Sequence, residues 1–188
     1  MHLCHSNAIE LTVEVGTLFV KAGCKLGLGK EVLDNLRQNS WITILLSGVN
    51  YLLIHFSIKK DFRSLGRLVS LCKRRSIILN AESWHIIVRA LVEDNRIDDA
   101  LVVLADISIE HKLVPQRATF TVIMNALKAQ EKNKEIVELY LNMNKLQINP
   151  SSTSTSLAVR AHFQLADVDS AVTTLKEYLG YEQSHYNY

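Results

Sequence analysis

The feature that most constrains this chain is an internal repeat of 35 to 36 residues, seen when segment 81–116 is aligned with segment 117–151. Apolar residues then fall on apolar residues along the whole alignment. The matched pairs are Trp84 with Phe120, Ala90 with Ala126, Leu91 with Leu127, Ala100 with Ile136, Leu104 with Tyr140, Ile107 with Met143, and Pro115 with Pro150. A period of this length is typical of an array of supersecondary units, each of which buries its apolar face only against a neighbour.

Each unit has the apolar pattern of two amphipathic helices. In segment 81–116 both helices follow the spacing i, i+3, i+4, i+7, which places these residues on one helical face. They are Trp84, Ile87, Val88 and Leu91 in the first helix, and Ile97, Ala100, Leu101 and Leu104 in the second. Pro115 ends the unit, because proline has no amide donor. Ala90, Ala126 and Ala161 occupy one equivalent position, which predicts a close approach between helices there.

Four features together resemble the pentatricopeptide repeat family over about residues 46–179. They are the segment 95–101 (NRIDDAL), the aromatic residue four places into each unit (Trp84, Phe120), the apolar residue near the end of the second helix (Ile107, Met143), and the terminal Pro115 and Pro150. The tetratricopeptide repeat is the nearest alternative, but its period is 34 residues and its signature is missing. The resemblance implies an all-α fold, a right-handed α-α superhelix of helix-turn-helix repeats.

The repeat register predicts the domain organisation. A degenerate hairpin occupies 1–45, repeats occupy 46–80, 81–116, 117–151 and 152–180, and a tail occupies 181–188. In the first hairpin we expect helices over 9–22 and 30–37, joined by the glycine-rich segment 23–29. Next comes a helix over 41–58, capped by Ser40, and the last helix is expected to end near Gly180. The polar segment 151–156 is interpreted as a helix start, because hydroxyl residues are good N-caps.

Charge is unevenly distributed along the chain. Residues 1–80 carry 11 Lys and Arg against 5 Asp and Glu, whereas residues 81–188 carry 10 against 14. The cations concentrate in 59–75, where they fall on the outward side of an apolar helical register. They are Lys59, Lys60, Arg63, Arg67, Lys73, Arg74 and Arg75. Such a surface can hold RNA phosphates, dock on an acidic partner, or keep the protein soluble.

The sequence offers no catalytic constellation, so we expect no enzyme activity and no cofactor. The glycine-rich segment 23–29 is not a phosphate loop, since Cys24 and Glu31 stand where that motif needs glycine and a hydroxyl residue. A metal site at His2, Cys4 and His5 is weighed against a solvated terminus, which we favour. The apolar segment 41–58 is interrupted by polar residues, and we expect no membrane span. Three cysteines, an odd number, favour a reducing compartment.

The resemblance implies modular recognition of single-stranded RNA, one base per repeat. In that family the fifth and last residues of a repeat read a base and the second packs against it. The reading pairs here are Asn50 with Asn80, His85 with Gln116, and Thr121 with Ser151, beside the basic residues Lys73, Arg74 and Arg75. The packing positions hold Ser47, Glu82, Ala118 and Thr153. His85 departs from the residue types that the family uses, and its longer repeat predicts a displaced Gln116.

The expected function is therefore that of an organellar, mitochondrial protein which binds single-stranded RNA or an RNA-containing assembly in RNA processing, stability or translation. The mitochondrial location is implied by the family alone. An alternative stays open: a protein-interaction solenoid whose concave groove grips a peptide or partner helix, as an assembly factor or ribosome-associated subunit.

Overall fold

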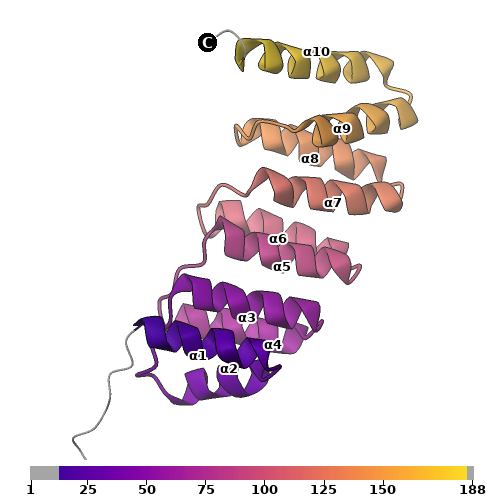
Figure 1. Ribbon diagram of the computed structural model, residues 1–188. Coiled ribbons are helices and arrows are strands. Elements are labelled where there is room, and N and C mark those ends of the chain that lie inside the picture. Colours follow the sequence, from indigo (N-terminus) through magenta and orange to yellow (C-terminus); the bar gives the residue numbers. More distant parts are fainter. Residues whose placement is uncertain (1–12, 186–188) are drawn as a thin grey trace, which may run out of the picture. The chain divides into compact units, whose positions relative to one another are not determined.

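The computed structural model describes residues 13–185, and the all-α fold is confirmed for them (Figure 1). The helices are α1 (Val13–Lys25), α2 (Gly29–Gln38), α3 (Leu46–Ile58), α4 (Phe62–Arg74), α5 (Ala81–Glu93), α6 (Ile97–Ile109), α7 (Arg117–Ala129), α8 (Asn133–Lys145), α9 (Ser152–Gln164) and α10 (Val168–His185).

The helices follow a fixed stride. The helices α3, α5, α7 and α9 begin at intervals of 35, 36 and 35 residues. Within each pair, including α1 and α2, the second helix begins 16 residues after the first. Each predicted repeat thus contains one pair of helices, with its first residue at the start of the first helix.

One turn type joins the two helices of every pair. The residue 14 places after the start of the first helix has a positive φ, between 53° and 80°. The next amide donates to the carbonyl five residues earlier, the long-range bond of a Schellman motif. The positive-φ residues are Gly27, Lys60, Asn95, Glu131 and Ala166, and the bonds run from Leu28 to Gly23, Asp61 to Phe56, Arg96 to Leu91, Lys132 to Leu127, and Asp167 to His162. This shared turn explains the constant 16-residue stride.

The chain divides into two compact units, 1–90 and 91–188, with the boundary inside α5. In the first unit α1 packs on α2 and α3, and α3 packs on α4. In the second unit α7 packs on α6, α8 and α9, and α9 packs on α10. The fully buried side chains include Leu33, Leu36, Leu52, Leu53, Phe56 and Leu68 in the first unit and Phe120, Ile123, Met124, Leu127, Ile136 and Met143 in the second. Of the three equivalent alanines, Ala90 and Ala161 are buried and Ala126 is half-buried.

Glycines in the first unit permit close packing. A Cβ on Gly16 would lie 2.1 Å from the carbonyl oxygen of Thr43, and one on Gly29 would lie 2.4 Å from the ring of His55. Gly16 faces backbone that cannot move aside, so this position requires glycine, whereas a side chain at Gly29 would force the His55 ring to shift.

Two predicted boundaries are wrong. The helix expected from Trp41 begins at Leu46, because Trp41 lies in a turn and residues 42–45 are not helical. Burial alternates there, with Ile42 and Ile44 buried and their neighbours exposed. The helix expected to end near Gly180 continues to His185, since an added side chain at Gly180 would meet no neighbour and nothing there forces a stop. The first helix was expected from residue 9, and 1–12 and 186–188 lie outside the described residues.

Candidate nucleic-acid interface

The structure brings Asn50 and Asn80 together through one hydroxyl group. Asn50, on α3, is buried, and its Oδ1 accepts from Ser83 Oγ at 2.7 Å. Asn80 Oδ1 accepts from the Ser83 amide at 2.9 Å and lies 3.0 Å from Ser83 Oγ. The predicted reading pair of repeat 46–80 is therefore tied to the start of α5, where Asn80 acts as an N-cap. The sequence pattern Asn-x-x-Ser at 80–83 is the capping signal that identifies Ser83.

The half-buried His85, on α5, has an imidazole biased toward its neutral form. Burial is the largest effect that lowers the pKa of His85, followed by the charge of Arg89, while Glu82 acts in the opposite direction. A neutral imidazole carries one donor and one acceptor nitrogen, so this side chain can meet either kind of polar group on a base edge.

The other three reading residues lie on or beside α7 and α9. Thr121 is half-buried and its Oγ1 donates to the carbonyl of Arg117 at 3.2 Å. Ser151 is the N-cap of α9 in a complete capping box, in which Ser154 Oγ accepts from the Ser151 amide at 2.8 Å. Gln116 is the N-cap of α7 and makes no side-chain capping bond.

The longer repeat 81–116 does not displace Gln116 from this cap position. After α6, the amide of Leu113 donates to the carbonyl of Ile107, six residues earlier. The equivalent bonds after α4 and α8, from Ile77 to Cys72 and from Ile148 to Met143, span five residues. The turn after α6 thus absorbs the extra residue. The expected displacement is wrong for this reason.

The second residues of the repeats share one environment. Ser47, Glu82, Ala118 and Thr153 are all exposed in the first turns of α3, α5, α7 and α9. A surface at this position is thus accessible in every repeat, although none of the four residues is a large aliphatic one.

Arg75 has a role that the sequence did not indicate. Its guanidinium donates to the carbonyls of Ile42 at 2.7 Å and Asn39 at 2.9 Å, and also to that of Leu36. Burial, then the charge of Arg74, lowers the pKa of Arg75. The prediction that Arg75 lies among outward-facing cations is therefore wrong. The end of α2 and the non-helical segment after it leave carbonyls that a planar group with five N–H donors can satisfy.

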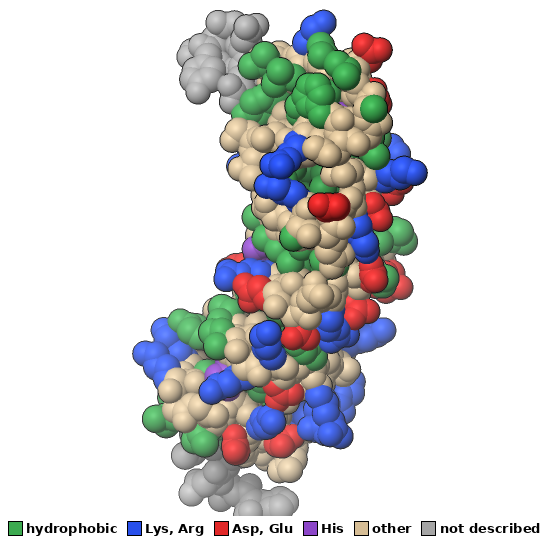
Figure 2. Space-filling model, turned by 90° about the vertical axis from the view of Figure 1, so that its right-hand side faces the viewer, with side chains coloured by type: hydrophobic (Ala, Val, Ile, Leu, Met, Phe, Trp, Pro, Cys, Tyr) green, Lys and Arg blue, Asp and Glu red, His purple; other side chains and the backbone are tan. Residues whose placement is uncertain are grey.

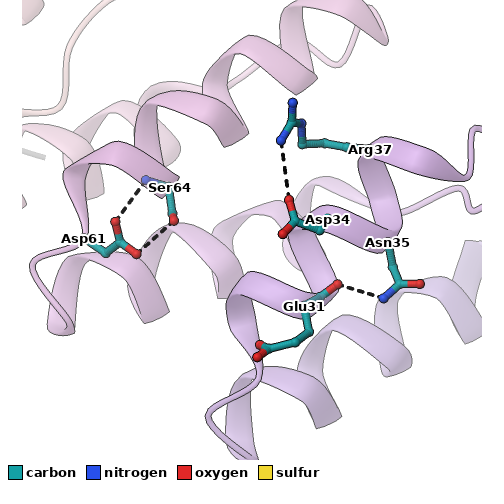
Figure 3. Close-up of polar contacts among 6 residues, drawn as sticks. All are labelled: Glu31, Asp34, Asn35, Arg37, Asp61 and Ser64. Atoms are coloured by element: carbon teal, nitrogen blue, oxygen red, sulfur yellow. Dashed lines mark hydrogen bonds and ion pairs between the residues drawn. The ribbon is translucent and has the colours of Figure 1, made fainter.

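Two acidic side chains of the first unit, Asp34 and Asp61, are engaged within it (Figure 3). Asp61 Oδ1 accepts from the Ser64 amide at 3.1 Å, so Asp61 caps α4, and its Oδ2 lies 3.1 Å from Lys30 Nζ. The Ser64 amide is the first cause that lowers the pKa of Asp61. Asp34 pairs with Arg37 at 3.4 Å on α2. These carboxylates therefore neutralise Lys30 and Arg37 rather than the cations of α4.

Six cations remain exposed along one stretch, which we call the basic segment. Its members are Lys59, Lys60, Arg63, Arg67, Lys73 and Arg74. Lys59 and Lys60 also line a hollow of about 530 Å³ together with Lys30 and His55, and with the carboxylates of Glu31 and Asp61. Figure 2 shows blue side chains gathered over the lower part of the view, where α1–α4 lie. This arrangement suits a polyanion.

Residues 13–180, whose side chains the structure describes, hold neither a metal-ion cluster nor a membrane span. No group of three or more His, Cys, Asp or Glu side chains there is placed to hold a metal ion. None of the helices in that range is both long and apolar enough to span a bilayer. His2, Cys4 and His5 lie outside the described residues.

Comparison with known proteins supports the fold. No protein-family model matches the sequence, and no curated protein sequence is similar to it. Among solved structures, the crystal structure of the pentatricopeptide repeat protein PPR10 from maize superposes with a TM-score of 0.67 over 91% of this chain. The fold is pentatricopeptide-repeat-like. Sequence identity over the match is 14%, and the match covers 24% of the maize chain.

The predicted reading residues occupy equivalent positions in the repeats of this fold. The fifth-position residues Asn50, His85 and Thr121 all lie in the second turn of a first helix, and the last-position residues Asn80, Gln116 and Ser151 all stand directly before the next first helix. The repeat register thus places the predicted reading residues at equivalent points. Their hydrogen bonds show that Asn80 and Ser151 also serve as helix caps.

Proposed function

We propose that this protein binds single-stranded RNA, or an assembly that contains it, through the first unit. The observation that carries the proposal is the basic segment, six exposed cations on a pentatricopeptide-repeat-like fold. Resemblance to that family implies single-stranded RNA as the ligand, because unpaired bases are open to side chains on successive repeats.

Charge supplies most of the proposed affinity. Each phosphate that a Lys or Arg neutralises releases condensed counterions, so affinity falls steeply as salt rises. Base reading adds little, since Asn50 is buried and bonded to Ser83. At about 1 kcal/mol for a base contact, the remaining residues discriminate weakly between sequences. We therefore expect binding with strong salt dependence and little sequence preference.

The test is fluorescence anisotropy with a short single-stranded oligoribonucleotide, titrated from about 50 to about 200 mM salt. The double variant Lys73→Gln/Arg74→Gln removes two cations from the end of α4. If both contact phosphates, the slope of log affinity against log salt becomes shallower by about 1.4, because each contact to a single strand contributes about 0.7. Binding at low salt also weakens.

The matched control is Lys134→Gln/Lys145→Gln, which removes two exposed cations from α8 in the second unit. This variant is expected to keep the affinity and the salt slope of the original protein. Equal effects of the two double variants would refute the basic segment as the site, and failure to retain any single-stranded RNA at low salt would refute RNA binding itself.

A mitochondrial location and a role in RNA processing, stability or translation are also part of the proposal, and both rest on the family resemblance. Cell fractionation with protease protection of the native protein tests the location. Recovery with the protected organellar fraction supports it. Crosslinking in the native extract, followed by sequencing of the bound RNA, identifies the process.

A second candidate function is protein binding, and exposed apolar residues on α3 favour it. Tyr51, Ile54 and Ile58 are 37%, 43% and 76% exposed, at a spacing that places them along one side of the helix. Such a row suits the apolar face of a partner helix in an assembly-factor or ribosome-associated role. Affinity purification of the original protein and of the Ile54→Ser/Ile58→Ser variant, each after ribonuclease treatment, tests this function. A partner protein that stays bound to the original protein without RNA, and is lost from the variant, supports it.

A further inference from the structure

Repeat 46–80 carries a histidine where the other repeats carry alanine. Counting the first residue of each first helix as position 1, position 10 of α3 is His55. The equivalent residues of α5, α7 and α9 are Ala90, Ala126 and Ala161. The start of α2 leaves room for the larger side chain, because its first residue is Gly29, where a Cβ would lie 2.4 Å from Cδ2 of the imidazole. The helices α4, α6 and α8 begin instead with Phe62, Ile97 and Asn133. This junction is thus built around an imidazole.

The half-buried His55 lines the hollow of about 530 Å³ that Lys30, Lys59 and Lys60 also line. The ring of Phe56 contacts the imidazole edge to face, with the two centroids 5.6 Å apart, and so restricts its orientation. Lys30 lies in the first turn of α2, and Lys59 and Lys60 directly follow the end of α3. Two helix ends therefore bring three lysines and the imidazole to one hollow. Its volume lies within the range of about 300–1,000 Å³ that is usual for small-ligand sites.

Two carboxylates also line the hollow, and they differ in their contacts. Asp61 is held by α4 and α2, since its Oδ1 accepts from the Ser64 amide at 3.1 Å and its Oδ2 lies 3.1 Å from Lys30 Nζ (Figure 3). Asp61 thus neutralises Lys30 and fixes it beside the hollow. Glu31 is exposed. Three lysines against two carboxylates leave the hollow one positive charge, in addition to the donor of a neutral imidazole.

We propose that this hollow binds the phosphate monoester of a terminal nucleotide, with Lys59, Lys60 and His55 as its donors. This inference rests on the proposed function and names the part of the RNA that the first unit holds best. A phosphate monoester has about −1.5 to −2 charges at pH 7 and three strong acceptor oxygens. An internal phosphodiester has a single charge, so it gains less from a hollow in which several donors meet. A free mononucleotide carries the same monoester, and the test separates these sources.

The test compares three forms of one short, internally labelled oligoribonucleotide: with a 5′-phosphate, with a 3′-phosphate, and with hydroxyl groups at both ends. Affinities are measured by fluorescence anisotropy at about 100 mM salt, where distant charges are screened. A terminal phosphate is expected to tighten binding about tenfold, the effect of one hydrogen bond to a charged group. A gain at either end supports the proposal and identifies that end. Equal affinities of all three strands would overturn it and leave the proposed function standing.

Fluorescent adenosine 5′-monophosphate, compared with adenosine carrying the same label, tests the hollow without RNA. Tighter binding of the monophosphate supports a monoester site that also accepts free nucleotides. If the monophosphate binds and no RNA strand does, even at low salt, the proposed function fails and the monoester site stands.

Lys59→Gln/Lys60→Gln removes two cations of the hollow and is expected to make the phosphorylated and hydroxyl strands bind alike. The matched control is Lys73→Gln/Arg74→Gln, which removes the same charge from exposed residues of α4 outside the hollow. It is expected to weaken both strands and to keep the tenfold ratio between them. A ratio that falls equally in both double variants would overturn the proposal, because the preference would then reflect overall charge.

Two single substitutions act in opposite directions. Glu31→Gln removes a carboxylate from the hollow and is expected to raise the phosphate preference about threefold. A lower preference in this variant would contradict the proposal. His55→Ala gives position 10 the residue of the other repeats, so circular dichroism is expected to show unchanged helix content. This variant is expected to lose most of the preference, whereas a purely structural role of His55 would change the affinities of both strands equally.

Discussion

The hairpins α1–α2 and α7–α8 share their inner turn and differ in how they connect to the next repeat. Both turns have the Schellman bond, from Leu28 to Gly23 at 2.8 Å and from Lys132 to Leu127 at 3.0 Å. After α8 the chain closes with its own backbone bond, from Ile148 to Met143, before α9 begins. After α2 the chain forms a turn and a non-helical segment, and carbonyls of this connection accept from the side chain of Arg75, the C-cap residue of α4. A regular repeat thus completes its connection locally, whereas the first hairpin depends on a distant residue.

Removing that distant residue is expected to have the largest effect. Arg75→Met keeps the aliphatic stem but removes the donors to the carbonyls of Leu36, Asn39 and Ile42. Since partly buried carbonyls lose charged donors, we expect the free energy of unfolding to fall by about 3 kcal/mol, measured by urea denaturation. Arg74→Met, at an exposed neighbour, is expected to change it by no more than about 0.5 kcal/mol.

Arg75→Lys sharpens this comparison. It keeps the positive charge but cannot supply a planar fork of donors to three carbonyls. If the geometry of the guanidinium matters, Arg75→Lys recovers only a small part of the free energy of unfolding that Arg75→Met loses. Full recovery of stability by lysine would mean that charge alone, and not the bonds after α2, explains the role of this residue.

The same contrast shows what the sequence could and could not predict. The helical pairs of 81–151 were predictable because burial on one helical face depends on local spacing alone. The non-helical segment 41–45 was missed, since the apolar run that contains Trp41 fits either a helix or a strand when its neighbours are unknown. The partners of Arg75 are 33 to 39 residues away, so no local pattern indicates them. The cap by Asn80 was within reach, because Ser83 follows at the standard capping distance.

The second largest loss of stability is expected from overpacking position 10 of a repeat, counted from the first residue of its first helix, and this position can be compared in two hairpins. Ala161, at position 10 of its repeat, is 1% exposed, whereas its equivalent Ala22 on α1 is exposed. Ala161→Phe overpacks the junction and is expected to lower the free energy of unfolding by about 2 kcal/mol. Ala22→Phe is expected to change it by no more than about 0.5 kcal/mol. Equal losses from both substitutions, measured by urea denaturation at low protein concentration, would show that the outer side of α1 is packed in solution.

The smallest expected effect tests the turn that all hairpins share. Gly27 and Ala166 hold the same turn position, with φ of 80° and 60°. An alanine Cβ at Gly27 would meet no atom within 4 Å, so Gly27→Ala tests backbone strain alone. An alanine in a left-handed conformation is strained, whereas glycine is not. Gly27→Ala is therefore expected to lower the free energy of unfolding by about 1 kcal/mol.

The reciprocal substitution Ala166→Gly is expected to raise the free energy of unfolding by about 0.5 kcal/mol, since the relief of strain is partly offset by the greater freedom of glycine in the unfolded chain. Opposite signs at the two sites would establish that α1–α2 and α9–α10 turn in the same way despite their different connections. If both substitutions destabilise the protein, neighbouring contacts relieve the strain at Ala166. The two turns would then share their backbone angles but not their energetics.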